Sequence, residues 1–179
     1  PNLPNFDVNN TAYALFGEGT WTFNEKWAVT GGLRQSYDER ELTVKSFQFD
    51  AAALEPICAV FDENDVRLPD DNCSRTVDEK FDKLTWRSAV SFTPVDKMLI
   101  YGSVSTGYRT GGFNSRGSNN FTLQPFDEET VLTYEIGHKT DWDLGNLAAM
   151  RTNLAIYLQE YDDIQKTVSG SNPHTAAFE

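Results

Sequence analysis

The feature that most constrains this chain is an alternation of apolar and polar side chains, with a period of two residues, in six long segments. In residues 27–40, Trp27, Val29, Leu33 and Tyr37 fall on one face of an extended strand, whereas Arg34, Asp38 and Arg40 fall on the other. The same alternation occupies residues 13–23, 83–92, 98–109, 129–142 and 147–163. The pattern predicts an all-β fold of long strands with almost no helix.

The connections between these segments alternate in length. Tight turns at residues 24–26, 93–97 and 143–146 join the segments in pairs, and long loops at about 44–80 and 111–128 join the pairs. This arrangement predicts antiparallel up-and-down strands, with short turns at one end and long loops at the other. Bacterial outer-membrane barrels have this arrangement, and some soluble up-and-down sheets share it.

Composition excludes several classes of protein. The formal net charge of −12 over 179 residues argues against nucleic acid as a partner, because phosphates require a basic face. The sequence has no apolar window long enough for a transmembrane helix. Transmembrane strands carry only an alternating pattern of about ten residues each, so a polar average composition does not exclude a membrane.

The largest aromatic side chains on the apolar face lie beside the short turns. They are Trp21, Phe23, Trp27, Phe92 and Trp142. Such a cluster is typical of the aromatic girdle of a membrane barrel, where an amphipathic ring lies at the level of the lipid headgroups. A soluble core would more often place its largest rings in the middle of the strands.

Four blocks resemble the barrel of TonB-dependent outer-membrane receptors. They are WAVTGGLRQSY at 27–37, LIYGSVSTGYRTGGFN at 99–114, ETVLTYEIGHKTDW at 129–142 and NLAIYLQEYDDIQ at 153–165. Together with their surroundings they cover about residues 13–42 and 84–168, in the order in which the family has them. The resemblance implies a 22-stranded transmembrane barrel, closed by a plug domain, that takes up scarce ligands with energy from the TonB complex.

The resemblance also sets expectations for this chain. We expect residues 1–179 to be an internal portion of such a barrel, with about six strands and without the plug. The expected function is to supply wall and extracellular loops to a transporter of the bacterial outer membrane, with a ferric siderophore as ligand and no catalysis or cofactor. Expected partners are outer-membrane lipid, lipopolysaccharide, the plug and the TonB complex.

If the short turns are periplasmic, the loops at 44–80 and 111–128 and the tail after 168 face outward. The charged face of the strands then lines the lumen, with Arg34, Arg87, Glu135, Lys139 and Arg151. In the alternative, a half-buried soluble sheet, the same charged face meets bulk water.

The first long loop contains the only cysteines, Cys58 and Cys73. In an oxidising compartment we expect a disulfide between them, stabilising the fold by about 3 kcal/mol, with two free thiols as the alternative. The same loop has four acidic candidates for a calcium site, Asp62, Asp65, Asp70 and Asp71. Their order is not that of an EF-hand, so a solvated acidic loop is favoured over a metal site.

The region from Asp38 to Asp82 carries thirteen acidic and five basic residues. An anionic iron chelate would therefore need basic residues inside the mouth, and Arg109 and Arg116, on either side of Gly111-Gly112, are the candidates. Aromatic contacts to the ligand are proposed for Tyr108, Phe113 and Phe121. The alternatives are that Arg109 pairs with a carboxylate of the wall or plug, and that the rings are ordinary rim aromatics.

The stretch at 103–114 is predicted to be the outer end of a strand. Ser103, Ser105, Gly107 and Arg109 fall on the lumen side, and Val104 and Tyr108 fall on the lipid side. Gly111-Gly112 ends the strand, where we expect glycine to supply the backbone angles of a sharp departure.

Catalysis has little support in the sequence. His138 and His174 lie in no known catalytic motif, and the adjacent Asp162 and Asp163 point to opposite faces of a strand. Two alternatives to the receptor remain at this level. One is a soluble or secreted β-sheet module that uses the same loops for recognition, and the other is a non-specific porin.

Overall fold

The computed structural model describes residues 2–50, 55–143, 145 and 148–166, which form one antiparallel sheet. Its strands are β1 (Asn2–Asn24), β2 (Trp27–Asp50), β3 (Glu55–Cys58), β4 (Arg75–Phe92), β5 (Met98–Arg109), β6 (Glu129–Asp143) and β7 (Ala149–Asp162). The order across the sheet is β1-β2-β4-β5-β6-β7, and the short β3 pairs with the end of β2. The predicted all-β, up-and-down fold is confirmed. Within the described residues, no helix has the length and apolarity needed to cross a membrane.

Three strands are longer than their sequence patterns predict. β1 begins at Asn2 rather than near Tyr13, β2 continues to Asp50, and β4 begins at Arg75. The pairing of β1 with β2 is unbroken from Asn2–Gln48 to Thr22–Ala28, although the outer part of both strands is largely polar. Backbone hydrogen bonds therefore continue where the alternation of side chains has faded, and the first long loop is correspondingly shorter than predicted.

The register separates an apolar face from a polar face. Paired residues of an antiparallel sheet point to the same side, so the pairs Trp27–Phe92, Leu33–Trp86 and Trp142–Met150 define the apolar face. Most large side chains on this face are exposed, including Trp21, Leu33, Ile136 and Leu154. An uncovered face of this size is unusual for a soluble sheet and suits a lipid environment.

Aromatic pairs bound the apolar face at two levels. At the end with the short turns, the rings of Trp27 and Phe92 stack with centroids 4.4 Å apart, and towards the loops Tyr13 stacks on Tyr37 at 5.2 Å. Trp27 and Tyr37 are separated by about 33 Å along an extended strand. With a strand tilt of about 45°, the band between them is about 23 Å tall, close to the height of the apolar band of membrane barrels.

Charged residues follow immediately beyond this band. On the apolar face, Tyr37 is paired with Asp82, and the next pair on that side is Glu39 with Lys80, whose side chains form an ion pair at 3.4 Å. The parts of β2 and β4 just beyond the apolar band are thus charged on this face.

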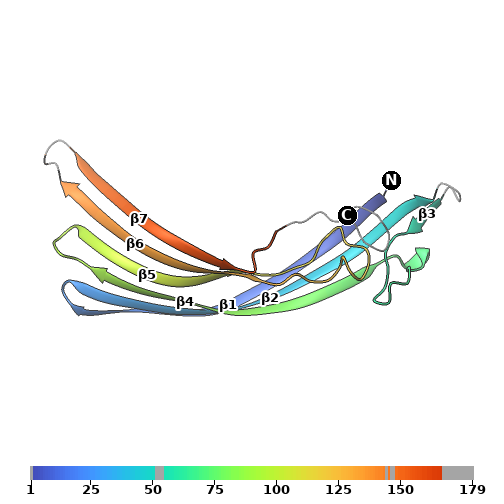
Figure 1. The fold of residues 1–179 in the computed structure, drawn as a ribbon, viewed down its shortest axis with the longest axis horizontal. Coiled ribbons are helices and arrows are strands. Elements are labelled where there is room, and N and C mark those ends of the chain that lie inside the picture. The colour runs from blue at the N-terminus through green and yellow to red at the C-terminus, as the bar shows by residue number, and fades with distance from the viewer. Residues whose placement is uncertain (1, 51–54, 144, 146–147, 167–179) are drawn as a thin grey trace.

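The sheet forks within the band, at the level where Arg87 of β4 is paired with Gly32 of β2. β4 pairs with β2 as far as Arg75–Val44, but it pairs with β5 only from Phe92–Ile100 to Arg87–Ser105. Figure 1 shows β1, β2 and β4 running on beyond the ends of β5, β6 and β7, with loop segments beside them. The fork leaves room on the polar face of the projecting ribbon, and loops occupy it.

The small core of the chain lies at this loop end of the sheet. Its buried members are Leu42 and Val44 of β2, together with Cys58, Val60, Cys73 and Leu123 of the loops. Because Leu42 and Val44 have the same strand parity as Arg34, the loops pack on the polar face of the sheet. The face with the charged side chains is therefore covered at its outer end, whereas the apolar face is not.

The apolar band can be tested with one residue inside it and one beyond it on the same face. We expect Leu33→Arg to destabilise the folded, membrane-inserted state by about 2–4 kcal/mol, because it places a cation at mid-depth in lipid. Glu41→Arg, on the same face but outside the band, should change this stability little. The measurement is the folded fraction in lipid vesicles, scored by heat-modifiable migration on gels. Equal effects of the two substitutions would contradict the band.

Candidate functional site

The outer end of β5 lies on the polar side of the fork. Thr106 Oγ1 accepts a hydrogen bond from the backbone N–H of Trp86 at 2.9 Å, at the point where the two strands stop pairing. Two residues later, the Tyr108 hydroxyl donates a hydrogen bond to Asp38 Oδ2. Asp38 belongs to the polar face of β2, so the expectation that Tyr108 faces lipid is wrong. Strand parity fails here because β5 has left the plane that it shares with β4.

Asp38 joins Tyr108 to a chain of polar groups along β2. Its Oδ1 lies 3.4 Å from Arg40 Nη2, and its side chain is only 10% exposed. Arg34 Nε donates to the buried Ser36 Oγ at 3.1 Å, and the Arg34 guanidinium lies 5.9 Å from the centre of the Phe16 ring. Arg40 Nε is buried without an acceptor among the described residues. A buried donor without an acceptor costs free energy, so this part of the polar chain is less well satisfied than the rest.

Two adjoining hollows open between this polar chain and the end of β5. One has a volume of about 570 Å³ and is lined in part by Phe16, Arg34, Asp38 and Tyr108. The other, of about 380 Å³, is lined in part by Arg40, Gly112, Phe126 and Gln165. Arg109 and Thr110 line both hollows. We call the two hollows together the rim cleft; three guanidinium groups, those of Arg34, Arg40 and Arg109, border it.

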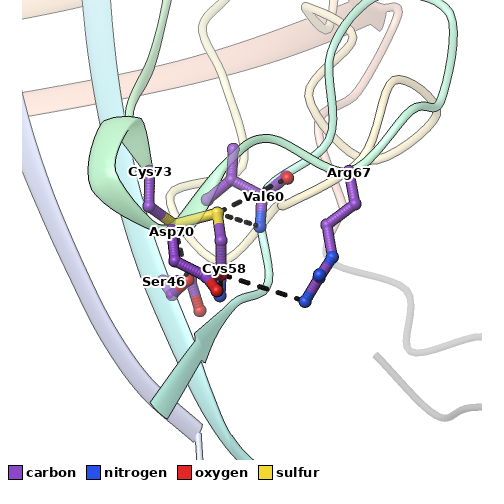
Figure 2. The surroundings of a disulfide bond; sticks show 6 residues. All are labelled: Ser46, Cys58, Val60, Arg67, Asp70 and Cys73. Carbon is purple, nitrogen blue, oxygen red and sulfur yellow. Dashed lines mark hydrogen bonds and ion pairs between the residues drawn. A yellow bond between two sulfur atoms is a disulfide. The ribbon is translucent and has the colours of Figure 1, made fainter.

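The disulfide loop, residues 55–74, covers the polar face further out. Cys58 and Cys73 form a disulfide, with Cα atoms 5.5 Å apart, and the two cysteines are 0% and 6% exposed. Figure 2 shows Asp70 beside this bond, where its Oδ1 accepts the N–H of Cys58 at 2.6 Å and lies 3.9 Å from Arg67 Nη1. Cys73 Sγ lies 3.2 Å from the carbonyl oxygen of Ser46, which brings the bond against β2.

Three of the four acidic calcium candidates, Asp62, Asp65 and Asp70, accept backbone N–H groups of the loops. Asp62 Oδ1 accepts the N–H groups of Asn64 and Val66, each at 2.8 Å, and so closes a tight turn. Asp65 Oδ1 accepts the N–H of Asn120 at 3.0 Å. Asp71 lies in the 3₁₀ turn Asp70–Asn72. In the described part of the chain, no three acidic, cysteine or histidine side chains are grouped as metal ligands.

The rim loop, residues 110–128, separates the five candidate ligand contacts. Arg109 borders the rim cleft and Tyr108 lines it, whereas Phe113 also packs against the loop core. Arg116 is exposed and its own N–H is bonded to Asn114 Oδ1 at 3.0 Å, and Phe121 is 69% exposed. Neither Arg116 nor Phe121 lines the cleft. Arg40 and Asp38 do line the cleft, although the sequence pattern alone places them only on the polar face.

The five residues predicted to line the lumen share the polar face by register: Arg34, Arg87, Glu135, Lys139 and Arg151. Arg87 lies 3.7 Å from Glu18, and Arg151 Nη2 donates to Asp141 Oδ2 at 3.0 Å. Glu135 accepts the Tyr101 hydroxyl at 2.6 Å, and the Lys139 ammonium lies 5.4 Å from the centre of the same ring. The charges of this face are thus largely paired within the chain below the rim cleft.

Among the described residues, His138 belongs to no group of potential metal ligands. His138 lies on the apolar face, with Nε2 2.7 Å from Thr140 Oγ1. His174 lies outside the described residues. Asp162 is paired with Thr130 at the end of β7, and the next residue, Asp163, has a positive φ of 55°.

Gly111 is needed for a close approach of the backbone, not for the unusual backbone angles that we expected. Neither Gly111 nor Gly112 has a positive φ; among the described glycines only Gly145 does. A Cβ on Gly111 would instead lie 2.1 Å from the carbonyl oxygen of Phe126 and 2.5 Å from the Phe81 ring. Glycine at this position permits a close approach, which holds the base of the rim loop against β4.

The fold of the whole segment defines its class. A curved up-and-down sheet with an uncovered apolar band, bounded by aromatic pairs, and a charged opposite face is a wall segment of a transmembrane β-barrel. Residues 1–178 match the family described as TonB-dependent receptor-like, beta-barrel. The chain therefore belongs to the TonB-dependent receptor barrel family, whose members are transporters of the bacterial outer membrane rather than enzymes.

A solved structure supports the fold. The ferric yersiniabactin uptake receptor FyuA from Yersinia pestis superposes with a TM-score of 0.69 at 16% sequence identity. The match covers 92% of this chain and 22% of that receptor. The chain thus spans less than a quarter of the neighbour's length.

The two glycines at the base of the rim loop make a matched pair for mutation. We expect Gly111→Ala to destabilise the loop base by about 1–3 kcal/mol, because the new methyl overlaps a backbone oxygen. Gly112→Ala should cost less, since its methyl meets only the tip of the Phe126 ring at 3.2 Å. Trypsin cleavage after Arg116 in the folded protein measures the effect. Faster cleavage in Gly112→Ala than in Gly111→Ala would show that the close approach is not what holds the loop.

Removing the disulfide should loosen the loop that it closes. Because the two cysteines are 15 positions apart in the sequence, we expect the Cys58→Ala/Cys73→Ala variant to lose about 3 kcal/mol of stability in this loop. The measurement is the rate of trypsin cleavage after Arg67, which should rise while cleavage after Lys26, in the turn at the opposite end of the sheet, stays constant. An unchanged rate at Arg67 would mean that packing alone orders the loop.

Proposed function

We propose that this chain is an internal portion of the barrel of a TonB-dependent outer-membrane transporter, and that the complete receptor takes up a ferric siderophore. Six wall strands are too few to close a barrel, since the smallest membrane barrels have eight. The remaining wall, the plug and the contact with the TonB complex would come from other parts of the receptor. The short turns would lie in the periplasm and the two long loops outside, against lipopolysaccharide.

The observation that carries this proposal is the rim cleft. Arg34 borders one hollow of the rim cleft, Arg40 borders the other, and Arg109 borders both. Planar guanidinium groups recognise the carboxylate and phenolate oxygens that are typical of iron chelators. Phe16 and Tyr108 add aromatic surface at the same place. The solved structure that resembles this chain is named a ferric yersiniabactin uptake receptor, which agrees with an iron-containing ligand.

The setting of the cleft supports an anionic ligand inside the barrel rather than on its surface. The surrounding region from Asp38 to Asp82 carries a large excess of acidic residues, several of them on the projecting ribbon. Anions are disfavoured at such a surface and favoured only where basic groups outweigh it locally. In a closed barrel, the polar face with its three arginines would be the lumen wall beneath the loops.

The soluble alternative conflicts with the exposed apolar face. Leu15, Trp21, Leu154 and Ile156 are each more than two-thirds exposed, and no described segment of this chain covers them. A receptor that contains this segment should therefore need detergent to stay monodisperse. A monodisperse, cooperatively melting chain in plain buffer would overturn the membrane assignment.

The ligand site can be tested in the complete receptor, expressed in a strain that lacks other iron receptors. We expect Arg109→Gln and Arg40→Gln each to weaken binding of a ferric siderophore about tenfold, because each removes a charged hydrogen-bond donor. Arg151→Gln, which removes a paired arginine near the short turns, is the matched control. The measurement is uptake of radioactive iron from a panel of ferric chelates.

The outcomes separate the function from the site. If the unmutated receptor takes up iron from none of the chelates, iron transport is wrong, and glycans or cobalamin become the next ligands to assay. If it takes up iron and the Arg109 and Arg151 variants are equally active, iron transport stands and the rim cleft is not the binding site.

A further inference from the structure

Arg75, the first residue of β4, contacts both long loops at once. Its Nη1 donates to the carbonyl oxygens of Phe61 and Asp62 in the disulfide loop, each at 3.1 Å. Its Nη2 donates to Asn120 Oδ1 in the rim loop, also at 3.1 Å. The two loops are separated by the whole of β4 and β5, and one guanidinium group joins them.

Two further hydrogen bonds connect the loops directly, one donated by each of them. The N–H of Phe61 donates to the carbonyl oxygen of Ser118 at 2.8 Å. The N–H of Asn120 donates to Asp65 Oδ1 at 3.0 Å. If the loops parted, both backbone donors would need new partners, and Arg75 would lose its acceptors in at least one loop.

Apolar packing joins the same segments. Leu123 of the rim loop is 3% exposed and belongs to one cluster with Val60, Cys58 and Cys73 of the disulfide loop. Phe113 of the rim loop and Val77 of β4 pack against that cluster. Separation of the loops would therefore expose the disulfide and Val60 to water as well as Leu123.

We infer that the disulfide loop and the rim loop form a single cooperative unit fixed on the polar face, and that Arg75 is the positioning residue that couples them. The disulfide then acts at a distance, because the order that it gives to residues 55–74 is passed on to residues 110–128. The rim loop begins next to Arg109, so the geometry of the rim cleft depends on this unit. The inference concerns the coupling of the loops and holds whatever ligand the receptor binds.

Hydrogen–deuterium exchange on the complete receptor in detergent micelles tests the coupling. In Arg75→Gln we expect amide exchange to accelerate about tenfold or more in both loops together, since elements of one cooperative unit open together. Exchange in β6 and β7 should stay unchanged. Arg67→Gln is the matched control; it removes the same charge from the disulfide loop, but Arg67 forms an exposed ion pair with Asp70 of its own loop, so both loops should keep their exchange rates.

A reciprocal variant tests the coupling from the other side. Asn120→Ala alters only the rim loop, and because coupling free energies are reciprocal, exchange should accelerate in residues 59–66 of the disulfide loop. The Cys58→Ala/Cys73→Ala variant should likewise accelerate exchange in residues 117–123. The inference is overturned if each substitution loosens only its own loop, or if Arg75→Gln changes neither loop. Should Arg75→Gln fail to fold, the Asn120 and cysteine variants decide the question by the same criterion.

Discussion

The structure depends on the long antiparallel pairing of β2 with β4. This ladder extends past the end of the β4–β5 ladder and so creates the fork. Beyond the fork, no described strand lies beside β4 on the side of β5, which leaves space over the polar face of the projecting ribbon. Both long loops fold into that space and bury Leu42 and Val44 there. Had β5 followed β4 to its outer end, Tyr108 would face away from Asp38 and the rim cleft would not exist.

Charges on the polar face are paired differently below the rim and at the rim. On the polar face below the rim, charges are mostly neutralised within the chain, as for Arg87 with Glu18 and Arg151 with Asp141. At the rim, Arg40 shares Asp38 with the Tyr108 hydroxyl, and its Nε has no acceptor among the described residues. The polar groups of this face that are not fully paired are therefore concentrated at the rim cleft, which lies beneath the loops and within an acidic region.

The sequence was sufficient for the fold class, the strand order, the disulfide and the position of the aromatic residues at the short turns, because alternation and turn residues encode them locally. It was insufficient for strand length, since the outer halves of β1 and β2 lie beyond the apolar band and need no apolar face. It also misplaced Tyr108, because parity within one strand gives no sign that its neighbour has diverged. The alternation placed Arg40 on the polar face, but its position in the rim cleft depends on contact with the rim loop, which begins about seventy residues later in the chain.

The contacts between the two loops have a consequence for how such a receptor can change its ligand. If the rim loop alone were replaced by that of a relative, Arg75 would lose its acceptor there, Asn120. The new loop would also face a disulfide loop that was shaped to bury Leu123. A block running from the disulfide loop through the rim loop, residues 55–128, keeps both sides of that interface intact. Recombination between receptors should therefore succeed at the ends of this block far more often than within it, which makes the loop pair, rather than the single loop, the unit of exchange.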